Sequence, residues 1–219
     1  PGVVGIAERD RLESAARWGE QGRWKACPER GCPRVGGRGL RRGRCGGRAA
    51  ARYAARELPA ALSTFGDDDI RNAFHSVDQA CGEPKHDKSG STATVAVVVN
   101  NSLVVANVGD SRAIACCPLV VLTEDHVASD ENEAARIQKL GGTIVERRVE
   151  DRVVLTRSIG NRALDPFLIA EPHITRHPLA SFQYLIVATD GLWDVMTTDE
   201  AVRVAANLLD GGATPPYYA

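Results

Sequence analysis

The chain has 219 residues, of which 43% are hydrophobic and 25% are charged, and its formal net charge is −1. This length and apolar content fit one globular domain, and the near-neutral charge excludes bulk attraction to nucleic acids or membrane surfaces. The six cysteines lack the regular spacing of a secreted disulfide framework, and no signal-peptide segment or bilayer-length apolar stretch is found. We therefore expect an intracellular protein of the cytoplasm or nucleus, with reduced thiols.

The first part of the chain, residues 1–45, is rich in arginine and glycine and is predicted to be irregular, with a short helix at Ile6–Trp18. The Arg/Gly run has almost no aromatic residues between its arginines, which disfavours nucleic-acid binding. Its three cysteines, Cys27, Cys32 and Cys45, lack the fourth ligand of a structural zinc site.

Two helices are predicted next, over residues 48–63 and Asp67–Cys81. Pro59 is expected to end or kink the first helix. The second helix begins with acidic residues, which suit the positive end of the helix dipole. Ile70, Phe74 and Val77 form one apolar face of this helix, and we expect that face to be buried.

Three apolar segments then predict an antiparallel meander over residues 90–117. A short polar turn, Asn100-Asn101-Ser102, separates the first two strands. Gly109-Asp110 separates the second strand from the third and is predicted to be a hairpin turn. This arrangement would place Asp110 at an acidic corner of the sheet.

In the second half, a helix is predicted at Glu131–Leu140, ending at Gly141-Gly142. The buried strand Tyr184–Ala188 leads into Asp190, and Asp194 follows four residues later. Two carboxylates at a strand end suit a hard cation such as Mg²⁺ or Mn²⁺. The alternative is that Asp190-Gly191 is only a turn and that Asp194 caps the following helix at Thr198–Leu209. Asp110, at the acidic corner of the meander, favours the cation site over this alternative.

Seven short motifs in this order resemble those of the metal-dependent protein serine/threonine phosphatases of the 2C type. They are Gly90-Ser91-Thr92-Ala93, Ala106-Asn107-Val108-Gly109-Asp110-Ser111-Arg112, Leu122-Thr123-Glu124-Asp125-His126, Arg136-Ile137 with Gly141-Gly142, Leu155-Thr156-Arg157-Ser158-Ile159-Gly160, Ala170-Glu171-Pro172, and Ala188-Thr189-Asp190-Gly191-Leu192-Trp193-Asp194-Val195. Because single motifs of this length are weak signals, the resemblance depends on their common order.

The resemblance implies an α+β fold: a four-layer α-β-β-α sandwich, which we expect to be incomplete at both ends. Residues 46–210 would form a partial phosphatase domain, preceded by the unmatched segment 1–45 and followed by a short tail, 211–219. Residues 124–160 would correspond to the family's flap. The implied partners are phosphoproteins, as substrate or ligand, and we expect a monomer that binds neither nucleic acid nor membrane.

The resemblance also implies a site for Mg²⁺ or Mn²⁺. Asp190 would belong to the two-metal centre, and Asp110 and Asp194 to a weaker accessory metal site. We assign no residue a catalytic role, because His126, Arg112 and Arg157 are expected to brace loops.

Two metal ligands of the family have no counterpart in this chain. The family's Asp-Gly-His-Gly-Gly motif should end at Gly46-Gly47, but residues 40–45 contain neither Asp nor His, and the late Asp-Asn pair is absent. In the family the Asp-Gly-His-Gly-Gly motif is preceded by Val-Phe. Codons for Val-Phe-Asp-Gly that are read one nucleotide out of phase give Leu-Arg-Arg, which is the sequence at Leu40-Arg41-Arg42. The alternatives are an active phosphatase, an inactive pseudophosphatase that binds phosphoproteins, and a gene product that is truncated or translated from a wrongly assigned reading frame. We expect little or no activity from the chain as given.

Overall fold

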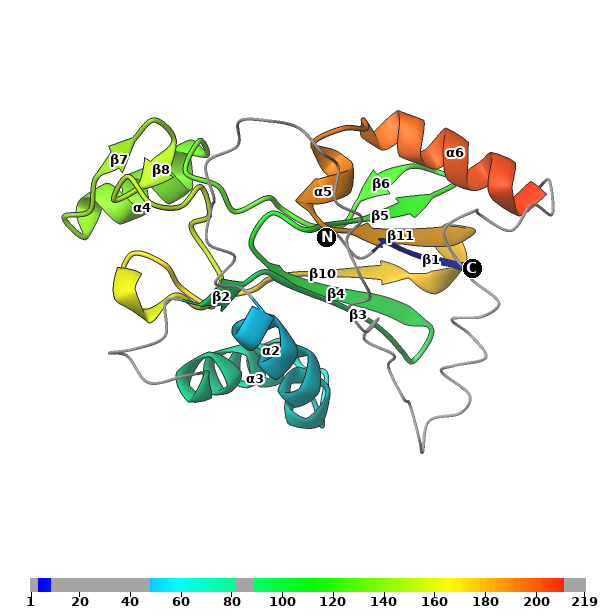
Figure 1. The fold of residues 1–219 in the computed structure, drawn as a ribbon. Helices are drawn as coiled ribbons and strands as arrows, with labels where there is room; N and C mark the ends of the chain where they lie inside the picture. Colours follow the sequence, from blue (N-terminus) through cyan, green and yellow to red (C-terminus); the bar gives the residue numbers. More distant parts are fainter. Residues whose placement is uncertain (1–3, 9–47, 82–88, 211–219) are drawn as a thin grey trace.

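The computed structural model describes residues 4–8, 48–81 and 89–210 of the chain (Figure 1). Its elements in chain order are β1 (Val4–Glu8), α2 (Arg48–Ala61), α3 (Asp67–Ala80), β2 (Gly90–Ser91), β3 (Ala93–Val99), β4 (Ser102–Val108), β5 (Arg112–Cys116), β6 (Val120–Val121), α4 (Glu131–Lys139), β7 (Ile144–Val145), β8 (Arg148–Val149), β9 (Ile159–Gly160), β10 (His173–Pro178), β11 (Tyr184–Ala188), α5 (Asp190–Trp193) and α6 (Thr198–Asp210), with two 3₁₀ turns at Arg162–Leu164 and Leu179–Ser181.

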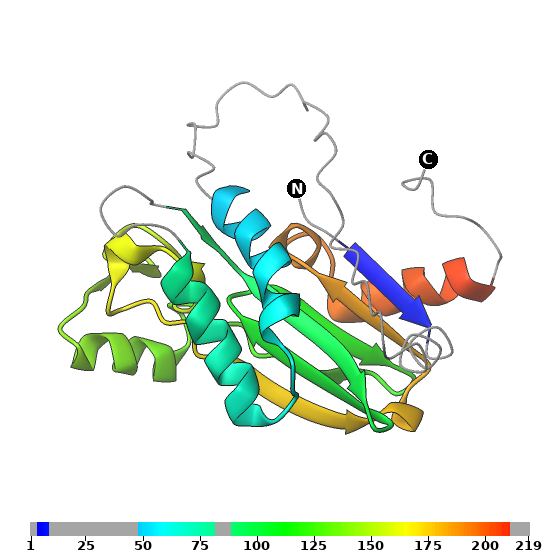
Figure 2. The ribbon, with the colours of Figure 1, turned by 90° about the horizontal axis from the view of Figure 1, so that it is seen from below.

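Two antiparallel sheets form the centre of the molecule. One has the strand order β1-β11-β5-β6, and the other has the order β10-β4-β3. Helices α2 and α3 lie on the outer side of the β10-β4-β3 sheet, and α6 lies on the outer side of the other sheet (Figures 1 and 2). The layers therefore run helix, sheet, sheet, helix, which confirms the expected four-layer sandwich.

The predicted three-strand meander is wrong at its second turn. β3 and β4 pair through an Asn100-Asn101 turn, but β5 pairs with β11 and β6 in the other sheet. β4 has β3 on one side and β10 on the other, so no edge is left for β5. Gly109-Asp110 is thus a crossing between two sheets, which apolar patterning alone could not distinguish from a hairpin.

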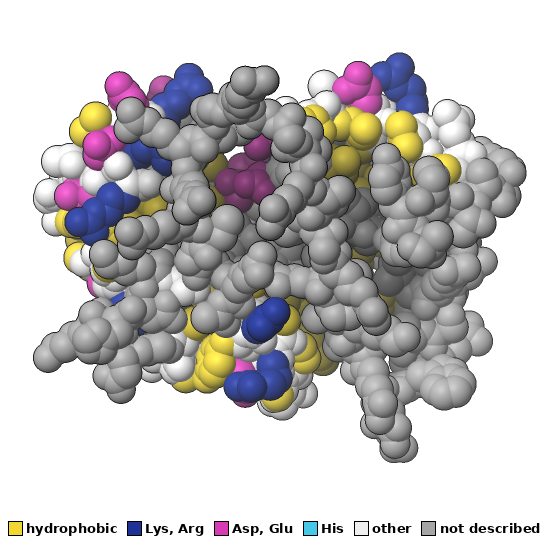
Figure 3. Space-filling model, viewed as in Figure 1, with side chains coloured by type: hydrophobic (Ala, Val, Ile, Leu, Met, Phe, Trp, Pro, Cys, Tyr) yellow, Lys and Arg dark blue, Asp and Glu magenta, His cyan; other side chains and the backbone are white. Residues whose placement is uncertain are grey.

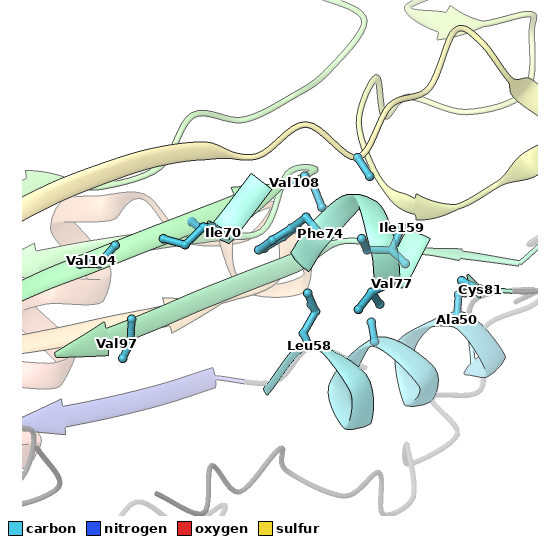
Figure 4. Close-up of a cluster of buried hydrophobic side chains, with 13 residues drawn as sticks. Ala50, Leu58, Ile70, Phe74, Val77, Cys81, Val97, Val104, Val108 and Ile159 are labelled. Atoms are coloured by element: carbon cyan, nitrogen blue, oxygen red, sulfur yellow. The ribbon is translucent and has the colours of Figure 1, made fainter. Parts of the chain in front are cut away.

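Successive apolar side chains of β4 point to opposite faces of its sheet, so this strand contributes to the core on both sides. Val104, Ala106 and Val108 face α2 and α3, where they pack with Phe74 and Ile70 (Figure 4). Leu103 and Val105 face the other sheet and pack against residues of β5 and β11. The outer side of that second sheet packs on α6 through Ile114, Ile186 and Ala205, among others.

The two N-terminal helices agree with their predictions to within two residues. Pro59 lies in the last turn of α2, which ends at Ala61. The buried side chains of α3 are Ile70, Ala73, Phe74 and Val77, which includes the whole predicted face. The helix predicted at Ile6–Trp18 is wrong where it can be compared, because β1 covers Val4–Glu8 and pairs antiparallel with β11; residues 9–18 lie outside the described ranges.

None of the helices in the described ranges combines the length and the apolar composition that a membrane crossing requires.

Helix α4 of the flap is joined to the body of the protein by a buried carboxylate. Glu133, with 8% of its side chain exposed, binds Arg157 Nη2 at 2.7 Å and Arg136 Nη2 at 3.0 Å. Arg157 also donates to the carbonyl oxygen of Glu171 at 3.0 Å. Burial alone would raise the pKa of Glu133, but the bonds from Arg157 and Arg136 lower that pKa to about 2.

This carboxylate predicts a defined acid sensitivity. Because the folded pKa of Glu133 lies below its ordinary value of 4.5, its stabilisation is complete above that pH and is lost as the pH falls toward 2. Urea unfolding should show Glu133→Gln to be less stable than the unaltered chain by on the order of 3 kcal/mol at pH 7, and this difference should shrink by roughly 1.4 kcal/mol at about pH 3.5. The exposed Glu131→Gln, on the same helix, is the control. A difference that is constant with pH would contradict the assigned pairing.

The tip of the flap hairpin β7–β8 is made by two residues with left-handed backbone, Glu146 (φ 48°) and Arg147 (φ 61°). L-residues pay a steric cost in this region, whereas Asn and Gly accept it. Replacing the pair by Asn-Gly should raise the free energy of unfolding by about 1 kcal/mol, measured by urea denaturation. An Ala-Ala replacement at the same two positions should give no such gain. An Asn-Gly variant no more stable than the Ala-Ala variant would show that the turn has a different backbone.

Candidate metal centre

Asp110 lies where the chain passes from β4 in one sheet to β5 in the other. The preceding Gly109 has φ +96°, and a Cβ at this position would lie 2.3 Å from the Thr92 side chain. Only glycine therefore fits. The crossing places Asp110 at the rim of the sandwich, next to the ends of β4 and β5.

His126 holds this crossing from the flap side. Its Nδ1 accepts a hydrogen bond from Gly109 N at 3.2 Å, and its backbone N–H donates to Gly109 O at 3.0 Å. Burial and the positive charge of Arg157 lower the pKa of His126 to about 4, so the ring is neutral at pH 7 and Nδ1 is able to accept. These bonds agree with the expected bracing role.

Asp190 and Asp194 belong to one turn of helix at the end of β11. Asp194 N donates to Asp190 O at 2.8 Å, and residues four apart in a helix share one face. Trp193 Nε1 donates to Ala188 O at 2.8 Å and so ties the turn to the strand. Gly191 has ordinary helical backbone, so it is the helical turn that brings Asp190 and Asp194 to one face.

Asp194 does not cap the following helix. Thr197 and Glu200 do so, because Thr197 N donates to Glu200 Oε2 at 2.8 Å and Glu200 N donates to Thr197 Oγ1 at 3.3 Å. The side chains of both Asp190 and Asp194 are exposed.

The three predicted carboxylates share one electrostatic environment. Burial raises the pKa of Asp110 to about 6, and the negative charges of Asp190, Asp125 and Asp194 add to the rise. In Figure 3, acidic side chains gather between the flap and the α5–α6 side of the molecule. Accumulated negative charge of this kind is favourable only when a cation or a proton compensates for it.

Asp125 is a fourth carboxylate at this place, and it was not among the ligands predicted from the sequence. Asp125 belongs to the motif Leu122-Thr123-Glu124-Asp125-His126, which the sequence marks as a unit. Arg112 neutralises it, with Nε at 3.2 Å from Asp125 Oδ1 and Nη2 at 2.5 Å from Oδ2.

These residues fit an open site for Mg²⁺ or Mn²⁺ better than a closed one. Within the described ranges, no group of three or more Asp, Glu, His or Cys side chains is placed so that it could hold a metal ion. Mg²⁺, however, usually keeps several waters and binds through one or two carboxylates, so a closed cage is not required. Asp110, Asp190 and Asp194 supply hard oxygen donors that repel one another without a cation.

Comparison with known proteins finds a phosphatase family whose members are similar to most of this chain. Residues 43–215 match the family described as "Protein phosphatase 2C". The chain is 36% identical over 137 residues to probable protein phosphatase 2C 11 of Arabidopsis thaliana, a match that covers 60% of this chain and 36% of the relative. It is 45% identical over 121 residues to probable protein phosphatase 2C 56 of Oryza sativa subsp. japonica, covering 52% and 34%. The chain thus spans about a third of the length of these curated relatives.

Solved structures show the same fold. A sex determining protein of C. elegans is 26% identical and superposes with a TM-score of 0.65, covering 74% of this chain and 45% of that one. The serine-threonine phosphatase 2C of Toxoplasma gondii, at 22% identity, superposes with a TM-score of 0.62 and covers 76% and 70%.

The crowded carboxylates predict a stability effect in the metal-free protein. Because the folded pKa of Asp110, about 6, lies above its ordinary value of 3.8, ionised Asp110 destabilises the fold above pH 6 and no longer does so below about pH 4. Asp110→Asn should therefore raise the free energy of unfolding at pH 7 by roughly 1–3 kcal/mol, and the gain should shrink as the pH falls to about 4. The exposed Asp199→Asn serves as the control and should give no gain. A destabilised Asp110→Asn would contradict the assigned repulsion.

Proposed function

The chain belongs to the protein phosphatase 2C family, and we propose that it is a metal-dependent phosphatase that hydrolyses phosphoserine and phosphothreonine in proteins. The observation that carries the proposal is that Asp190 and Asp194 lie close enough to Asp110 for their negative charges to raise its pKa. The three carboxylates come from two separate chain segments. The family explains why such a cluster is kept although its charges repel one another.

In this proposal Asp190 and Asp194 bind Mg²⁺ or Mn²⁺ from the turn α5, and Asp110 binds from the crossing between the sheets. A bound ion of this kind acidifies its water and neutralises phosphate oxygens. The chain's own contribution is to hold the carboxylates: Gly109 and His126 position Asp110, and the bond from Trp193 to Ala188 positions the turn.

The phosphoprotein substrate is proposed to be intracellular, because the six cysteines of the sequence lack the regular spacing of a secreted disulfide framework. The expectations of a monomer, and of no binding to nucleic acid or membrane, stay predictions.

A second candidate function is supported by one observation in the sequence. Residues 40–45, which lie outside the described ranges, contain no carboxylate where the family has its bridging aspartate. A protein without that ligand could still bind phosphoproteins. We therefore expect the rate of hydrolysis to be well below that of family members that carry the complete motif.

The test is Mn²⁺-dependent release of phosphate from a phosphothreonine peptide by the purified chain. We expect slow release that Asp190→Ala abolishes, because the variant removes a proposed metal ligand, and that Asp199→Ala leaves unchanged. A variant that keeps its circular dichroism spectrum would show that the loss is not due to unfolding.

One result would speak against phosphatase activity, and another against the proposed ligands. A folded chain that binds Mn²⁺ without releasing phosphate would favour the phosphoprotein-binding alternative. Release that persists in Asp190→Ala would mean that the proposed ligands are the wrong ones.

A further inference from the structure

Arg112 connects four segments that surround the candidate metal centre. It is the first residue of β5, two residues after Asp110. Its guanidinium binds both oxygens of Asp125 in the loop after β6, and Nη1 donates to Thr198 Oγ1 at the start of α6 at 3.4 Å. The guanidinium carbon also lies 5.3 Å from the centre of the Trp193 ring, within α5.

We propose that Arg112 is a positioning residue for the metal ligands, which fixes the turn carrying Asp190 and Asp194 against the Asp110 side of the site by stacking on Trp193. The inference rests on the metal centre of the proposed function. It assigns Arg112 no contact with the metal or the substrate.

Trp193 has a second contact, besides that with Arg112, which fixes its position. Its Nε1 is bonded to Ala188 O at the end of β11. Its ring faces the guanidinium, a favourable arrangement of a cation over an aromatic face. Since Asp190 and Asp194 flank Trp193 within one helical turn, a shift of the ring would move both carboxylates.

The planar fork of arginine is needed for this arrangement. Three of its nitrogens are engaged at once, two by Asp125 and one by Thr198, while the guanidinium carbon lies over the Trp193 ring. A lysine ammonium would keep the charge but could not hold these contacts in fixed directions.

The charge of Arg112 is a second reason to assign it a role at the metal centre. Four aspartates lie at this end of the sandwich, and Arg112 is bonded to one of them, Asp125. The pairing leaves the charges of Asp110, Asp190 and Asp194 available for a divalent cation. Replacing Arg112 by a neutral residue would add an unpaired negative charge, so the charge-conserving variant is the informative one.

The experiment uses the full chain with Trp18 and Trp24 changed to Phe, so that Trp193 is the only tryptophan left of three. Quenching of Trp193 fluorescence by added Mn²⁺ gives the dissociation constant, and acrylamide quenching without metal measures how well the ring is covered. Arg112→Lys is compared with Arg176→Lys. Arg176 also binds an aspartate, Asp67, but it does so from β10, which belongs to the other sheet.

We expect Arg112→Lys to expose Trp193 to acrylamide and to weaken Mn²⁺ binding about 10-fold or more, as is typical when a group that orients metal ligands is lost. Arg176→Lys should change neither value. An Arg112→Lys protein that is less stable but binds Mn²⁺ as tightly as its parent would overturn the inference, since Arg112 would then be purely structural. Absence of Mn²⁺ binding in the parent, or binding unchanged by Asp190→Asn, would overturn the metal centre itself and the inference with it.

Discussion

The passage of the chain between the two sheets at Gly109 is the constraint on which the site depends. A left-handed backbone and the contact with Thr92 exclude every side chain at this position. His126 is hydrogen-bonded to Gly109 through both its ring and its backbone, and these two bonds hold the start of the flap against the crossing. Because Asp110 is the next residue, the crossing fixes where its backbone lies, at the rim of the sandwich.

The electrostatics of the site follow from that placement. Burial and three neighbouring aspartates disfavour the charge on Asp110, and Arg112 compensates for only one of the four carboxylates. Elsewhere in the described ranges the protein treats buried charge differently: Glu133 is surrounded by Arg136 and Arg157, and its pKa falls instead of rising. Paired charges thus join the flap to the body, whereas unpaired charges remain where a cation is proposed to bind.

Several features could be predicted from short stretches of sequence because local physics decides them. The buried face of α3, the end of α4 just before Gly141, and the strand that leads into Asp190 depend on apolar periodicity and on residues that end helices. The prediction failed at β5, since a Gly-Asp turn between two apolar segments looks the same whether the strands pair or separate. It also missed Asp125, whose place beside Asp110 depends on contacts between segments distant in sequence.

Residue types and their local order were enough to predict α2, α3, α4 and α6, the strands β3, β4, β5 and β11, and the family resemblance from which the three ligands are proposed. Three outcomes came instead from tertiary packing: which sheet each strand joins, that Asp190 and Asp194 share a helical turn, and that Arg112 lies between Asp125 and Trp193. Those outcomes depend on which strand edges and sheet faces remain open once β4 has paired on both sides. Because segments distant in sequence compete for these edges and faces, short stretches of sequence do not reveal the result.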